Sequence, residues 1–168
     1  MMLTKFNFIT EKGETAMAGT GMYEEARRFL REPQEAVREL AIRMEQLRRW
    51  RELSDRVTSV LKTVRVQGQP QGNRVESCAC EVAELEEEIE RTRERIHTLR
   101  RKQESVLARV GDARLSELLR LYYQCSFTWA ETAEHMGYSE RQIMRLHRLA
   151  LERVQKILQE DSECHLAS

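Results

Sequence analysis

The chain has 168 residues, 33% of them charged and 40% hydrophobic, with two prolines and a formal net charge of zero. This balance excludes a global basic field that would attract nucleic acid or membranes, and no run approaches the roughly 18 apolar residues of a membrane span, so we expect a cytoplasmic protein. High charge with few prolines favours long exposed helices over a compact sheet, and we predict an all-α fold.

The N-terminal part of the chain divides into a tail and a long helix. Residues 1–21 are polar, contain glycines and show no hydrophobic period, which predicts a flexible tail. A helical hairpin is expected over residues 22–110, and Pro33 is tolerated in the first turn of its first long helix. One apolar seam is predicted along that helix, with a skip of three after Leu47. It comprises Val37, Leu40, Met44, Leu47, Trp50, Leu53, Val57, Val60 and Val64.

The chain is predicted to turn back near residues 65–76, where two glycines and Pro70 break the helical pattern. A second long helix follows, and its apolar residues keep a heptad spacing: Val82, Leu85, Ile89, Ile96, Leu99, Val106 and Val110. Thr92 and Gln103 are polar exceptions that either fix the register or lie in water-exposed layers. Because a two-helix hairpin buries little surface per residue, we expect it to pair with a second copy, as a homodimer, or with another protein.

A small helical domain is expected over residues 111–159, followed by a frayed tail over residues 160–168. Its first helix should pack beneath the helices that follow, through Leu115, Leu118, Leu119, Tyr122 and Tyr123. Phe127 and Trp129 are expected to close this small core. Stacking of Trp129 on a nucleic-acid base is the less favoured alternative.

Two helix-start signatures flank a glycine turn in this domain. Thr128 with Glu131, and Ser139 with Gln142, each place a hydroxyl at the N-cap and a returning side chain three residues later. Gly137 between them is free to adopt the positive φ that ends a helix. Two helices joined by a short glycine-containing turn predict a helix-turn-helix.

The second helix of this motif has two different faces at about 100° per residue. Its apolar face, expected to pack, comprises Ile143, Leu146, Ala150, Val154 and Ile157; its opposite, exposed face comprises Arg141, Arg145, Arg148 and Glu152. The predicted DNA-binding residues are Ser139, which opens the helix, Arg141, Gln142 and Arg145 as readers of base edges, and Arg148 on phosphate. The alternative is an ordinary solvated face. From Glu140 to Lys156 there are five basic and two acidic residues, so the electrostatic affinity should be modest.

This part of the chain resembles region 4 of bacterial sigma factors, over about forty residues from Leu115 to Val154. The segment 118–123 (LLRLYY) is similar to the helix before the motif, 129–139 (WAETAEHMGYS) to the first helix and turn, and 141–151 to the recognition helix. The whole chain also resembles a family of small phage and prophage proteins described as sigma-like transcriptional regulators. The resemblance implies promoter recognition and contact with RNA polymerase. Since no segment resembles the aromatic-rich region that melts promoter DNA, it does not imply stand-alone promoter opening.

The sequence contains no motif of a catalytic or cofactor site. There is no glycine-rich phosphate loop, metalloprotease histidine pair or nucleophile elbow, and the four histidines are scattered. The four cysteines (Cys78, Cys80, Cys125 and Cys164) match neither a disulfide framework nor a zinc spacing, so free thiols are expected. We therefore expect no enzymatic activity, no cofactor and no bound metal.

The sequence favours a sequence-specific transcriptional regulator that binds double-stranded DNA, encoded by a phage or prophage. Two alternatives stay open: a coiled-coil adaptor that binds RNA polymerase or a sigma factor without touching DNA, and a phage packaging protein that recognises genome ends.

Overall fold

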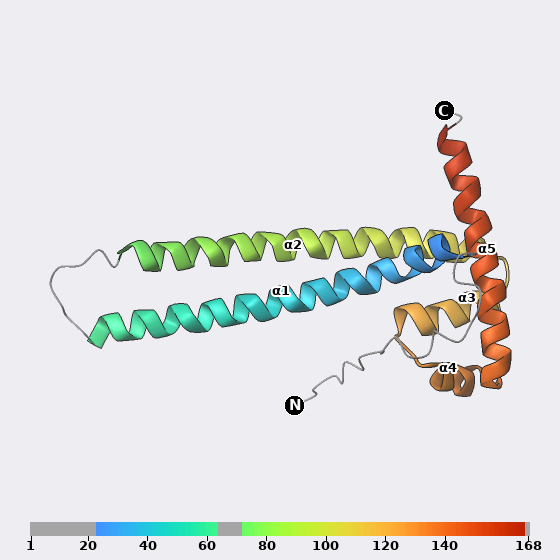
Figure 1. Cartoon of the computed structure of the whole chain (residues 1–168), viewed down its shortest axis with the longest axis horizontal. Helices are drawn as coiled ribbons and strands as arrows, with labels where there is room; N and C mark the ends of the chain where they lie inside the picture. Colours follow the sequence, from blue (N-terminus) through green and yellow to red (C-terminus); the bar gives the residue numbers. More distant parts are fainter. Residues whose placement is uncertain (1–22, 64–71, 167–168) are drawn as a thin grey trace. The chain divides into compact units, whose positions relative to one another are not determined.

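The computed structural model describes residues 23–166 except 64–71 and is helical in every regular element of this part of the chain, so the predicted all-α fold is confirmed. Its elements are α1 (Glu24–Thr63), α2 (Gly72–Arg109), α3 (Ala113–Leu119), the short π-helix η2 (Arg120–Gln124), α4 (Trp129–Met136) and α5 (Glu140–Leu166) (Figure 1). The tail expected at 1–21 lies outside the described residues. Part of the loop expected at 65–76 is helical, since α2 already begins at Gly72. None of the described helices has a stretch long and apolar enough to cross a membrane.

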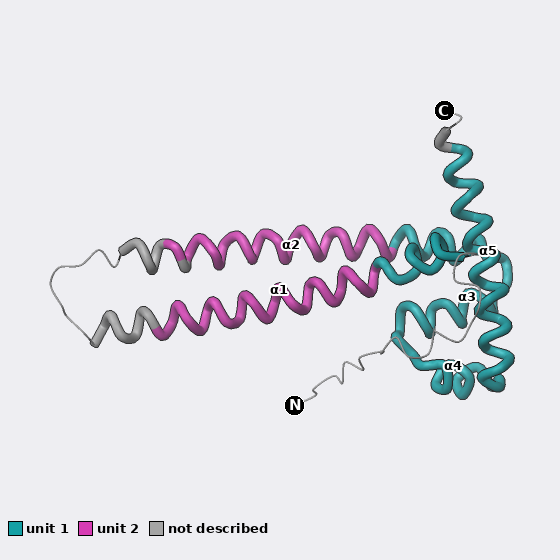
Figure 2. The backbone as a smooth tube through the Cα atoms, viewed as in Figure 1, with its two compact units in different colours: residues 1–32, 101–168 teal, residues 33–100 magenta. Residues whose placement is uncertain are grey.

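The chain forms two compact units, which differ from the predicted domains. Residues 33–100 make the hairpin unit, and residues 1–32 together with 101–168 make the terminal unit (Figure 2). The ends of both long helices thus belong with the C-terminal helices, whereas the sequence placed the boundary near residue 111. The heptad spacing of apolar residues along α2 continues to Val110. The sequence pattern therefore gives no sign of the boundary between the two units at residue 100.

The seam of α1 in the hairpin unit is offset from the predicted one. Met44 and Leu53 are 48% and 46% exposed, so their expected place in the seam was wrong. Six of the buried and half-buried positions of α1 in this unit repeat at alternating spacings of four and three. They are Ala36, Leu40, Arg43, Leu47, Trp50 and Ser54. This continuous heptad needs no skip.

Two members of the observed seam explain why apolar spacing alone missed it. Arg43 lies in the seam with its guanidinium paired with Glu39 at 2.8 Å on α1 and with Glu88 on α2, and Ser54 is polar. A pattern search that counts only large apolar residues passes over both positions. The predicted seam positions Val57, Val60 and Val64 lie outside the residues whose side chains are described.

The two polar exceptions in the second long helix are both buried, not in water-exposed layers. In the hairpin unit, Thr92 is 7% exposed, and its hydroxyl donates a hydrogen bond of 2.8 Å to the carbonyl of Glu88. In the terminal unit, Gln103 is 1% exposed. Its Nε2 donates to the carbonyl oxygen of Leu30 at 3.0 Å, and its Oε1 accepts from Gln124 at 3.2 Å. Gln103 therefore links α1, α2 and η2 through satisfied buried hydrogen bonds.

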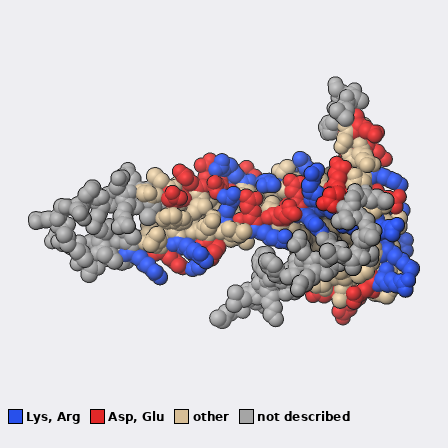
Figure 3. Space-filling view, in the orientation of Figure 1, with Lys and Arg blue, Asp and Glu red and all other residues tan. Residues whose placement is uncertain are grey.

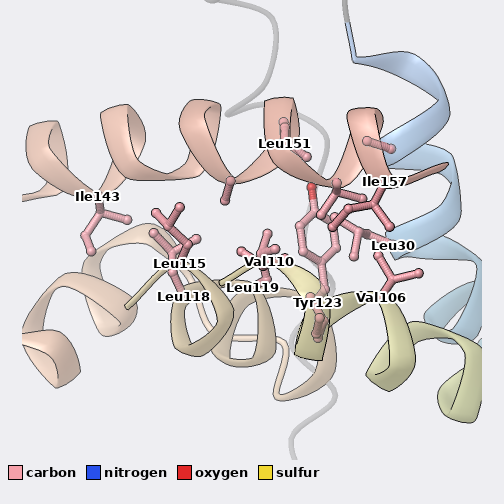
Figure 4. Close-up of a cluster of buried hydrophobic side chains, with 14 of the residues drawn as sticks. Leu30, Val106, Val110, Leu115, Leu118, Leu119, Tyr123, Ile143, Leu151 and Ile157 are labelled. Atoms are coloured by element: carbon pink, nitrogen blue, oxygen red, sulfur yellow. The ribbon is translucent and has the colours of Figure 1, made fainter. Parts of the chain in front are cut away.

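The core of the terminal unit is assembled from both ends of the chain. Ile143, Leu151 and Ile157 point from α5 toward Leu115, Leu118 and Leu119 of α3 and toward the long helices (Figure 4). Leu30 of α1 and Val106 and Val110 of α2 belong to the same cluster. Ala150 of α5 is fully buried. Because its side chain is only a methyl group, α3 can approach α5 closely.

Helix α5 runs to Leu166, so the frayed tail expected from residue 160 was wrong over residues 160–166. Three carboxylates lie near this C-terminal end, where the helix dipole disfavours negative charge. Arg109 of α2 offsets part of that charge because its Nη1 donates to Asp161 at 2.7 and 2.8 Å. Glu160 lies 3.6 Å from the same guanidinium.

Candidate nucleic-acid interface

Helix α4 begins with the predicted capping box. The backbone N–H of Glu131 donates to the Thr128 hydroxyl at 3.3 Å, and the Thr128 N–H donates to the Glu131 carboxylate at 2.7 Å. These hydrogen bonds lower the pKa of Glu131 below its ordinary value, because they stabilise the ionised carboxylate. The start of the motif is thus fixed by its own side chains.

The turn between α4 and α5 has the geometry expected from Gly137. This residue has φ 69° and ψ 31°, in the left-handed region. The N–H of Tyr138 donates to the carbonyl of Ala133 at 2.9 Å, and the N–H of Gly137 donates to Glu134 at 3.3 Å. This pair of hydrogen bonds is a Schellman motif, which ends α4 and redirects the chain within three residues.

The start of α5 also matches its predicted cap. The N–H of Ser139 donates to Oε1 of Gln142 at 3.0 Å, and the N–H of Gln142 returns a hydrogen bond of 3.4 Å to the Ser139 hydroxyl. The Gln142 amide oxygen is therefore committed to the helix start. Since reading adenine requires both the oxygen and the nitrogen of the amide, Gln142 must give up its capping role to act as a base reader.

The two faces of α5 are arranged as their spacing predicted. Ile143, Ala150 and Val154 are fully buried, Ile157 is 7% exposed and Leu146 is half-buried. Arg141, Arg145 and Arg148 are all exposed, within the first three turns of the helix, and Glu152 on the same side is half-buried. Packing against α3 and α4 thus leaves the arginine-bearing stripe uncovered.

The three arginines of this stripe differ from four other basic residues of the terminal unit. Among the described residues, none of the three forms an ion pair. By contrast, Arg109, Arg114, Arg120 and Lys156 are each held by a carboxylate at 2.7 to 3.2 Å. We call Arg141, Arg145 and Arg148 the basic stripe. No carboxylate of the described residues neutralises its charges, which suit an anionic partner.

Charge is distributed unevenly along α5. Lys and Arg gather over its N-terminal half at the right of the space-filling view, and carboxylates gather toward its C-terminal end (Figure 3). The acidic residues there are Glu160, Asp161 and Glu163. A polyanion following this helix meets attraction at the N-terminal turns and repulsion beyond them, which confines its contact to the first part of α5.

A cluster of aromatic rings fixes the motif from inside. His147 is 7% exposed, and its Nε2 lies 3.1 Å from the hydroxyl of Tyr123 in η2. The Trp129 ring stacks on Tyr122 at 4.1 Å and meets the His147 ring edge at 4.8 Å. Burial, followed by the charges of Arg27 and Arg31, lowers the pKa of His147 to about 3. His147 is therefore a neutral packing residue and is not available to phosphate.

Trp129 is half-buried against the core, as expected for a core-closing role. Phe127 is half-buried as well, but its ring lies against His135 at 5.9 Å, outside the main cluster. The π-helical turn at Arg120–Gln124 places Tyr123 inward, where it is 2% exposed. Sequence reasoning missed this turn because apolar spacing does not distinguish a π turn from an α turn.

Sequence reasoning also missed Leu149, a large apolar residue that is 42% exposed. At about 100° per residue it lies next to the basic stripe, one turn after Arg145. An exposed apolar side chain beside guanidinium groups suits contact with a thymine methyl group. The position of Leu149 on the helical wheel, beside Arg145, could have identified it from the sequence.

Comparison of the chain with protein-family models, with curated proteins and with solved structures found no match.

Proposed function

We propose that the chain is a sequence-specific transcriptional regulator that binds double-stranded DNA through α5 and acts in the cytoplasm of a bacterial host. The basic stripe is the observation that carries the proposal. Three exposed guanidinium groups, with no carboxylate partner among the residues that the structure describes, occupy the first turns of a helix that follows a tight turn. That is the part of a helix-turn-helix that enters the major groove.

The roles of individual residues follow from their positions. Arg141 and Arg145, nearest the helix start, are the proposed readers of guanine through bidentate hydrogen bonds. Arg148, one turn further on, is the proposed phosphate contact. Ser139 and Gln142 fix the helix start, and Gln142 reads a base edge only if its amide oxygen leaves the cap.

The resemblance to sigma factor region 4 supports the same role and adds RNA polymerase as a proposed second partner. The resemblance of the whole chain to small phage and prophage proteins supports a phage or prophage origin. The motif helices α4 and α5 are those that carry the resemblance, over residues 129–151. A regulator of this kind needs no catalytic group.

The proposal is tested by selecting bound sequences from a random duplex library with the full chain and then measuring affinity by fluorescence anisotropy. Arg141→Ala and Arg145→Ala should each cost about 1 to 3 kcal/mol with the selected site and relax specificity at one position. Arg148→Ala should weaken all sequences alike and reduce the salt slope by about 1.

Lys156→Ala is the matched control on the same helix. Lys156 is exposed and paired with Glu152 at 3.2 Å, and it lies about 12 Å along the helix axis from Arg148. Its replacement should leave affinity unchanged. Equal losses from all four variants would contradict the assignment of the stripe.

A salt titration separates DNA binding from an adaptor that binds only protein. The proposed phosphate contact by Arg148 predicts that log K falls as log salt rises, with a slope of about −0.9 for each phosphate neutralised. Absence of any selected duplex, together with retained binding to RNA polymerase, would favour the adaptor.

A further inference from the structure

The hairpin unit carries a groove between α1 and α2 that is lined by three apolar and seven charged residues, with Glu86, Glu90 and Arg93 on its α2 side. Met44, Leu47 and Ile89 form its apolar part, and the groove has a volume of about 480 Å³. Leu47 and Ile89 belong to the helix seam, but the Met44 side chain is 48% exposed. A unit of two helices leaves such surface uncovered because each helix has only one neighbour.

Charged residues border the groove along α1 in a regular order. Arg48 and Arg51 come first, and Glu52 and Asp55 follow; all four line the groove. At about 100° per residue they fall within one stripe of about 100° that also contains Met44. Arg51 and Glu52 lie at equal distances on either side of the midpoint between residues 51 and 52, and so do Arg48 and Asp55. In each of these two pairs the charges are opposite.

This order makes the stripe complementary to itself in one orientation. If a second α1 lies antiparallel with a two-fold axis at residues 51 and 52, Arg48 faces Asp55 of the second copy and Arg51 faces Glu52 of the second copy. The symmetry repeats both pairs, as it does in any isologous interface. A parallel arrangement in register would instead place each arginine opposite its own copy.

We propose that this groove binds the same groove of a second copy of the chain, with the two α1 helices antiparallel. The exposed Met44 side chains supply apolar contact beside the charged pairs. The proposal concerns the hairpin unit and does not depend on DNA binding.

The present partners of these charges do not oppose the arrangement. Arg51 pairs with Glu86 at 2.6 Å, and Arg48 pairs with Glu45 at 2.8 Å and with Glu52. The side chains of Arg48 and Arg51 are 57% and 59% exposed. Ion pairs at such exposed positions contribute little, so they exchange readily for pairs across an interface.

Two double variants of the full chain test the proposal by sedimentation equilibrium. R48E/R51E makes the stripe wholly acidic, and E52R/D55R makes it wholly basic. Each variant alone places like charges opposite one another and should associate at least about tenfold more weakly than the wild type. An equimolar mixture restores opposite charges at the four α1 positions and should associate more tightly than either variant alone.

The wild-type chain should reach twice its 19.8 kDa mass as concentration rises to about 100 µM. R49E is the matched control, because Arg49 is 73% exposed and paired with Glu45 away from the groove. It should associate like the wild type. Circular dichroism of each variant checks that helix content is retained.

M44S gives an independent test, since it removes apolar surface while leaving every charge in place, and the side chain that it replaces is 48% exposed. It should weaken association. The proposal would be overturned if the wild-type chain stayed monomeric or if the mixture of double variants failed to associate. It would also be overturned if the double variants and M44S associated as tightly as the wild type.

Discussion

Acidification should destabilise the terminal unit through His147, a histidine that the fold keeps uncharged. The ring is 7% exposed and lies among Tyr122, Tyr123 and Trp129. Its pKa is lowered to about 3, mainly by burial and to a smaller extent by the charges of Arg27 and Arg31. In the unfolded chain the same group has a pKa of about 6.5.

The sign and size of the effect follow from this difference. As pH falls below about 6.5, the unfolded chain binds a proton that the folded chain does not bind until about pH 3. The unfolded state is therefore favoured by up to about 1.4 kcal/mol per pH unit across this window. Between about pH 7.5 and pH 5 the free energy of unfolding should fall by about 2 kcal/mol.

Urea unfolding followed by Trp129 fluorescence in a Trp50→Phe background measures this quantity in the terminal unit. His147→Phe should lower stability at neutral pH, because it removes the partner of the Tyr123 hydroxyl, but should abolish most of the loss between pH 7.5 and 5. His135→Asn, at an exposed position, is the control and should keep the wild-type slope. A wild-type stability that stays constant over this window, or a His147→Phe slope equal to that of the wild type, would refute the reasoning.

Four further predictions concern the stability of the terminal unit, measured by urea unfolding of the full chain. Gly137→Ala should cost about 1 to 2 kcal/mol, because a Cβ there meets no atom within 4 Å and only the left-handed backbone opposes it; Gly137→Asn should cost less. Gln103→Leu should cost about 1 to 3 kcal/mol, since it removes the donor to the carbonyl of the fully buried Leu30. Thr128→Ala should cost about 1 kcal/mol through loss of the helix cap, and a larger effect of Thr128→Ser than of Thr128→Ala would contradict that cause. Arg109→Ala should change stability by less than about 1 kcal/mol, because its pair with Asp161 is exposed.

The helix-turn-helix was predictable because its determinants are local. The caps at Thr128 and Ser139 and the turn at Gly137 depend on residues at most five positions apart. The exposed and buried faces of α5 follow from its periodicity for the same reason. Local chemistry sufficed wherever one helix start or one turn decided the geometry.

The seam of α1 and the unit boundary were not predictable in the same way. Arg43 occupies a seam position because Glu88, 45 residues away, pairs with it. Leu30 joins the terminal core because Gln103, 73 residues away, binds its carbonyl. Contacts over such separations leave no periodic trace in the sequence, and the proline and glycine signals mark only the loop between the long helices.

The make-up of the terminal unit has a kinetic consequence. Its C-terminal helices contact one another over short sequence separations and should form early. The first turns of α1 contact them across a much longer separation: the N–H of Ala26 donates at 3.0 Å to Gln155, which lies 129 residues away in sequence. Closing so long a loop is entropically costly before the contact is made. The opening segment of α1 should therefore be the last part of this unit to dock during folding and the first to detach, and amide hydrogen exchange should report faster opening there than in α3.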